Sequence, residues 1–140
     1  MTKRLWLVLT VMVVVGCSAK FTPKMVQHIR GSVFSATDHG YYTTELVMRP
    51  KQPKVGVNKA HLIIHNYDAV DMPGLKIYVE PLLPARGITS PEKPTVKDAG
   101  RGLYIIENIV FPEPGNWELK LRIYGEELSD TVTLKIPEVK

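Results

Sequence analysis

Short runs of alternating apolar and polar residues dominate this sequence. In the clearest run, 117–124, apolar side chains stand at every second position: Trp117, Leu119, Leu121 and Ile123. Side chains of a β-strand point to opposite faces with a period of two, so this run predicts a strand with one buried face. A shift of one residue would exchange the two faces, so the pattern also specifies the register.

The rest of the chain also consists of short strand-like runs, which are separated by glycine, proline and asparagine, residues that favour turns. The runs are 41–48, 60–66, 75–79, 103–110 and 131–136, and a short edge strand is expected within 26–37. Residues 80–101 hold four prolines and are predicted to form one long connection. The chain is therefore predicted to be all-β, an immunoglobulin-like antiparallel β-sandwich of about seven strands.

The first 16 residues have the parts of an export signal. Lys3 and Arg4 give a basic start, and 5–15 is almost entirely apolar. This run has 11 residues, whereas a membrane-spanning helix needs about 20. We therefore expect residues 1–16 to be removed on export; an ordinary signal peptide or a short core helix is the alternative.

The end of this signal, Val14-Val15-Gly16-Cys17, resembles the bacterial lipobox. The resemblance implies that the Cys17 sulfur carries a diacylglycerol and that the new amino terminus is acylated. Cys17 is the only cysteine of the chain and has no disulfide partner. A lipid would hold the protein on a membrane, because acyl chains contribute about 0.8 kcal/mol per buried CH₂. Ser18, in place of Asp, favours the outer membrane in a Gram-negative cell.

The mature chain, 17–140, suits a single domain. We expect residues 17–39 to be a lipidated tether with the edge strand, and residues 40–140 to be the sandwich. Without Lys3 and Arg4, 16 of the 18 basic residues remain against 14 acidic ones, a formal charge of +2. This charge does not indicate nucleic-acid binding. The expected partners are a membrane, through the lipid, and an envelope protein; no cofactor is indicated.

Several segments beyond residue 40 resemble the YtkA-like (FixH-like) domain. They are 54–58, Asp68 with 74–79, 102–104 and, most specifically, the Phe-x-x-x-Gly-x-Trp-x-Leu run of 111–119. The resemblance covers roughly residues 40–137 and implies a small β-sandwich, exported or tethered to a membrane. Many members occur near copper handling or oxidase assembly. The resemblance thus offers a periplasmic metal carrier or oxidase-assembly factor as the alternative function.

The metal donors of the chain argue against a tight copper site. Many family members carry a Met-Pro-x-His-Gly-like segment where this chain has 83–87, Leu-Pro-Ala-Arg-Gly. Leu cannot donate to a metal and Arg stays protonated. His61 and His65 would lie about 13 Å apart on a strand, as two solvent-facing residues. The remaining candidate donors come from separate segments: Met25, His28, His39 and Met48.

No catalytic constellation is evident. Ser35, Asp38 and His39 are close only in sequence, whereas a triad is defined by geometry. Glu126 and Glu127 are typical of a solvated turn. We therefore predict a non-enzymatic binding or accessory module, with a purely structural envelope lipoprotein as a further alternative. Long connections are often functional, and a crossover between sheets is the structural alternative for 80–101. This segment supplies the candidate partner-contact residues Arg86, Lys93, Lys97 and Arg101.

Overall fold

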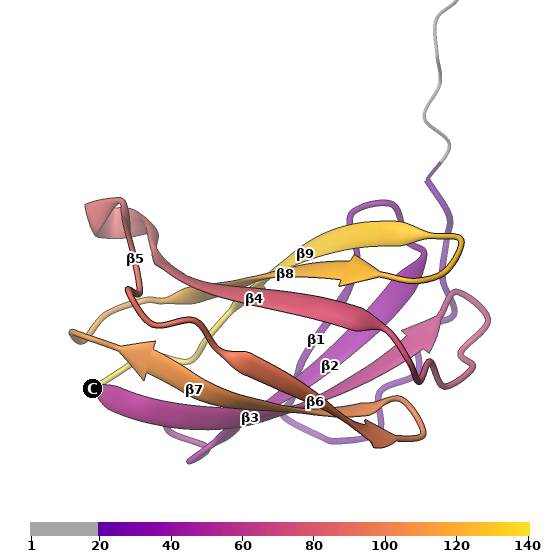
Figure 1. The fold of residues 1–140 in the computed structure, drawn as a ribbon. Helices are drawn as coiled ribbons and strands as arrows, with labels where there is room; N and C mark the ends of the chain where they lie inside the picture. Colours follow the sequence, from indigo (N-terminus) through magenta and orange to yellow (C-terminus); the bar gives the residue numbers. More distant parts are fainter. Residues whose placement is uncertain (1–19) are drawn as a thin grey trace, which may run out of the picture.

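Two antiparallel sheets pack face to face in the structure, a computed structural model that describes residues 20–140 (Figure 1). The first sheet has the order β1 (Val33–Ala36), β2 (Tyr42–Arg49), β3 (Gly56–Asn66), β7 (Leu103–Phe111) and β6 (Thr95–Gly100). The second has the order β5 (Ile88–Thr89), β4 (Lys76–Leu83), β8 (Glu118–Tyr124) and β9 (Ser129–Lys135). The predicted all-β sandwich is confirmed, with nine strands among the described residues instead of about seven. The predicted export signal and Cys17 lie outside the described residues.

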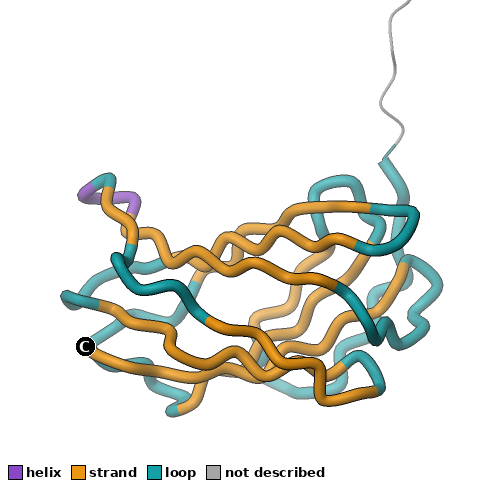
Figure 2. The backbone as a smooth tube through the Cα atoms, in the orientation of Figure 1, coloured by secondary structure: helices purple, strands orange, loops and turns teal. Residues whose placement is uncertain are grey.

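The core between the sheets is formed by the alternating apolar side chains. Trp117, Leu119, Leu121 and Ile123 are at most 1% exposed, as the pattern of this run predicted. Leu46, Ala60, Leu62, Ile64, Tyr104, Ile106, Ile109, Phe111, Val132 and Leu134 are buried with them. Loops gather at the two ends of the sandwich (Figure 2). Within residues 20–140, no helix is long and apolar enough to cross a membrane.

The segment 80–101, predicted as one long connection, contains regular structure. β4 continues to Leu83, a 3-10 turn spans Pro84–Arg86, and β5 and β6 follow. Pro81 is tolerated inside β4 because β5 pairs only with the last two residues of that strand. On the edge of β4 that faces β5, the Pro81 carbonyl oxygen accepts the Ser90 N–H. The prediction was wrong because proline, which usually ends a strand, is compatible with a strand edge that is only partly paired.

Residues 20–31, here the N-terminal segment, cover part of the outer face of the first sheet. Thr43 and Glu45 on β2 and His65 on β3 point away from the core, yet each is at most 4% exposed. Glu45 and His65 are buried because the N-terminal segment lies across them: Glu45 accepts the His28 N–H, and the His28 ring stacks on His65.

The N-terminal segment is also held by backbone hydrogen bonds at its start. The Phe21 N–H donates to the His39 carbonyl at 2.9 Å, and the Lys24 N–H donates to the Tyr67 carbonyl at 2.8 Å. Part of the stretch that the sequence assigned to a tether is therefore packed on the domain. The edge strand expected within 26–37 is β1, which pairs with β2.

Candidate functional site

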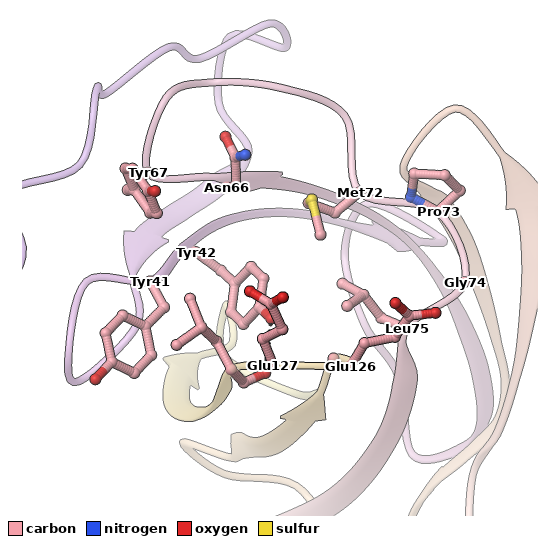
Figure 3. Close-up of a pocket in the computed structure, with 12 residues that line it drawn as sticks. Tyr41, Tyr42, Asn66, Tyr67, Met72, Pro73, Gly74, Leu75, Glu126 and Glu127 are labelled. Atoms are coloured by element: carbon pink, nitrogen blue, oxygen red, sulfur yellow. Dashed lines mark hydrogen bonds between the residues drawn. The ribbon is translucent and has the colours of Figure 1, made fainter.

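A pocket of about 420 Å³ opens at one end of the sandwich (Figure 3). Three parts of the chain line it: the start of β2, the β3–β4 connection and the β8–β9 turn. The aromatic and aliphatic part of its wall includes Tyr41, Tyr42, Tyr67, Met72, Leu75 and Leu128. The three parts are far apart in sequence, so the pocket exists only when the two sheets are packed together.

One wall is fixed by Tyr42, which is 3% exposed. Its hydroxyl donates to the Leu128 carbonyl at 2.8 Å, and the same carbonyl accepts the Gly125 N–H at 2.9 Å. Burial, assisted by the negative charge of Asp130, raises the pKa of Tyr42, so the phenol remains a proton donor. A Cβ on Gly125 would lie 2.5 Å from the Tyr42 hydroxyl oxygen. The close approach therefore requires glycine at this turn.

The opposite wall is fixed by a second buried phenol, that of Tyr104. Its hydroxyl donates to the Met72 carbonyl at 2.5 Å and accepts the Leu75 N–H at 3.0 Å. Burial raises the pKa of Tyr104. Asn66 adds a further constraint, because its side-chain oxygen accepts two N–H groups of the turn that follows it. Both walls are thus attached to the core, which keeps the pocket open before any ligand arrives.

The charge of the pocket is negative. Glu126 and Glu127 are exposed and extend from the β8–β9 turn toward Tyr42 and Leu75 (Figure 3). Among the described residues that line the pocket there is no Lys, Arg, His, Ser, Thr or Cys. Tyrosine faces and carboxylates both attract cations. The site therefore suits a cation with an apolar body.

The four candidate metal donors do not converge. Met25 is 54% exposed at the surface, whereas Met48 is 3% exposed in the core. The ring Nδ1 of His39 lies 2.9 Å from Asp130 Oδ1. His28 lies over the outer face of the first sheet, where it is bound to Glu45.

The structure brings His28 to His65 instead, with ring centroids 4.9 Å apart. The prediction that His65 faces solvent was wrong: it is 4% exposed, because the N-terminal segment covers it, and its Nε2 lies 3.0 Å from Asp71 Oδ1. The two rings are nearly parallel, at 24°, so their in-plane lone pairs do not converge on one ion. Within residues 20–140, no group of three or more His, Cys, Asp or Glu is placed to hold a metal.

Glu45 anchors the N-terminal segment to the sheet. Its carboxylate accepts the backbone N–H groups of His28 and Ile29, and the Ser32 hydroxyl at 2.9 Å. Burial alone would raise the pKa of Glu45, but these hydrogen bonds outweigh burial and lower the pKa below its ordinary value. The segment is therefore held by an ionised carboxylate.

The candidate partner-contact residues are dispersed rather than gathered on one loop. Arg86 lies in the 3-10 turn and contacts both carboxylate oxygens of Glu113 at 2.7 Å. Lys97 lies on β6 and Arg101 in the β6–β7 turn, at the end of the sandwich away from the 3-10 turn (Figure 1). Lys93 is exposed between β5 and β6.

The pocket residues were not identified from the sequence. The available signal was a set of tyrosines and glutamates at predicted strand ends, but only the topology shows which ends meet.

Comparison with known proteins places the fold in a family. A model of the YtkA-like family matches residues 38–122, and no curated protein matches the chain. A copper-bound variant of FetP from uropathogenic Escherichia coli has a similar structure, with 12% sequence identity and a TM-score of 0.52. The alignment covers 76% of this chain and 95% of that chain. At this identity the likeness shows a shared fold.

Proposed function

The chain belongs to the YtkA-like family, and we propose that it is a lipid-anchored extracytoplasmic accessory module that binds a partner without catalysing a reaction. Lipid on Cys17 would anchor it to the cell envelope. The observation that carries the proposal is the pocket at the end of the sandwich. Its walls are fixed by Tyr42 and Tyr104, its rim carries Glu126 and Glu127, and none of its lining residues within 20–140 is basic.

The ligand class that fits this pocket is a cation with an apolar body. A lysine- or arginine-bearing segment of another envelope protein has this chemistry. Each cation over a tyrosine ring contributes about 0.5–1 kcal/mol at an exposed site, and the two carboxylates add Coulomb attraction. Such a site gives weak, specific binding, as an accessory role requires.

The pocket is tested by titration of the isotopically labelled mature chain, made soluble by Cys17→Ser, with benzylamine. We expect amide chemical-shift changes at Tyr67, Gly74 and Gly125. Benzyl alcohol, which has the same ring and no charge, should bind about tenfold more weakly, a difference of about 1.4 kcal/mol.

The matched variants change one charge at a time. Glu126→Gln or Glu127→Gln should weaken benzylamine binding several-fold, whereas Glu92→Gln, at an exposed glutamate outside the pocket, should leave it unchanged. Equal binding of the amine and the alcohol, or shifts confined to other surfaces, would refute the cation site.

Copper handling is a second candidate, favoured by the copper-bound relative with the same fold. We expect weak, non-stoichiometric Cu(I) binding, because a copper site needs two or three converging soft or imidazole donors and His28 and His39 lie on separate carboxylates. Competition with a Cu(I) chelator measures it. Stoichiometric, tight binding that His28→Ala or His39→Ala removes would make the protein a metal carrier.

A further inference from the structure

Exposed apolar side chains are concentrated at one place on the described surface. Of the ten large hydrophobic residues that are exposed within residues 20–140, five lie on the start of the N-terminal segment and on the turn that it contacts: Phe21, Met25, Val26, Tyr67 and Val70. Hydrogen bonding between Lys24 and Tyr67 joins the two parts, and the Phe21 ring stacks on that of Tyr67 with centroids 5.3 Å apart. We call this set the apolar end patch.

The patch lies next to the predicted lipid attachment point. Phe21 is the fourth residue after Cys17, and a fully extended chain spans at most about 3.6 Å per residue. Phe21 is therefore within about 14 Å of the lipidated residue. A bilayer that holds the acyl chains of Cys17 must lie close to this end of the sandwich.

The charges and residue types of the patch suit a lipid interface. Residues 20–31 contain Lys20, Lys24 and Arg30 and no acidic residue. At a membrane surface, an apolar protein face inserts about 5–10 Å into the boundary between headgroups and acyl chains. Neighbouring lysines and arginines are attracted to anionic headgroups. Asp68 offsets one of these charges through its ion pair with Lys24.

We propose that the apolar end patch contacts the bilayer that carries the lipid, so that the sandwich stands end-on to the membrane surface. This inference rests on the lipidation of Cys17 in the proposed function. Tyr67 belongs both to the patch and to the pocket lining, so the pocket then opens beside the bilayer.

Two matched substitutions test this orientation. Val70 in the patch and Val57 near the start of β3 are equally exposed, at 55% and 58%. The length of β3 places Val57 about 30 Å from the patch end of that strand. In the mature lipoprotein Trp117 is the only tryptophan once residues 1–16 are removed, and it is buried. Val70→Trp and Val57→Trp therefore each add one exposed reporter.

The lipoprotein variants are reconstituted into vesicles of brominated phosphatidylcholine with phosphatidylglycerol, since bromine quenches tryptophan on contact. Above the Trp117 background, the emission of Val70→Trp should fall about twofold relative to unbrominated vesicles. The emission of Val57→Trp should not change.

The possible results distinguish failure of the end-on contact from failure of the lipid anchor on Cys17. Sedimentation with the vesicles but no quenching at position 70, or equal quenching at positions 57 and 70, would overturn the end-on contact and leave the anchor intact. Failure to sediment with the vesicles would refute the lipid anchor and, with it, this inference.

Discussion

Tyr42 and Gly125 share one hydrogen-bond acceptor, the Leu128 carbonyl, at 2.8 and 2.9 Å. The contact joins the start of β2 in one sheet to the β8–β9 turn of the other. The same contact forms a wall of the pocket. The shape of the candidate site therefore depends on the packing of the two sheets.

The first prediction is an energetic coupling between these two residues. Gly125→Ala should destabilise the wild-type domain, because the new Cβ would lie 2.5 Å from the Tyr42 hydroxyl oxygen. Tyr42→Phe alone should cost about 1 kcal/mol for the lost hydrogen bond. In the Tyr42→Phe background the cost of Gly125→Ala should fall by about 1 kcal/mol, within the range of contacting pairs. Urea unfolding of the four proteins measures this coupling; additive losses would contradict it.

The second prediction concerns the core. Trp117 is 1% exposed, packs on Phe111 and donates its Nε1–H to the Glu113 carbonyl at 2.9 Å. Trp117→Ala should lower the free energy of unfolding by about 3–5 kcal/mol. Trp117→Phe, which keeps an aromatic ring, should cost less. A loss below about 1 kcal/mol for the alanine variant, from denaturant midpoints, would show that this side chain does not stabilise the core.

The third prediction is a pH dependence that originates at Glu45. Its pKa is lowered in the folded state, so ionised Glu45 stabilises the fold. This stabilisation is complete above the unfolded pKa of about 4.3 and is lost as the pH falls through the folded pKa. Glu45→Gln should cost about 1–3 kcal/mol at neutral pH and less at pH values below the folded pKa.

The measurement is the free energy of unfolding of both proteins as a function of pH. Glu92→Gln is the matched control, and its pH dependence should follow that of the wild type. An equal cost of Glu45→Gln at neutral and acidic pH would contradict the role of the carboxylate. Asp130, whose pKa is also lowered although burial opposes this, should maintain some acid sensitivity in the Glu45→Gln variant.

Much of the fold could be predicted from the sequence, because its pattern is local. Period-two alternation identified the buried face of β8, which the structure confirms at Leu119 and Ile123. The strands within 80–101 were not predicted, because β6 has no buried residue and a proline such as Pro81 is rare inside a strand.

The candidate site could not be predicted, because it depends on contacts between distant segments. Glu126 and Glu127 have the pattern of an ordinary turn, and only the packing of β8 and β9 against β2 brings them beside Tyr41 and Tyr42. His65 was expected in solvent because no residue in its own strand indicates that the N-terminal segment will cover it.

The proposed function and the membrane contact both depend on the lipid on Cys17. The most direct measurement is incorporation of labelled palmitate by cells that produce the wild-type chain or Cys17→Ser. We predict that the wild type is labelled, whereas Cys17→Ser is unlabelled and accumulates as the larger precursor. Equal labelling of the two proteins, or no labelling of the wild type, would contradict a lipid-anchored module.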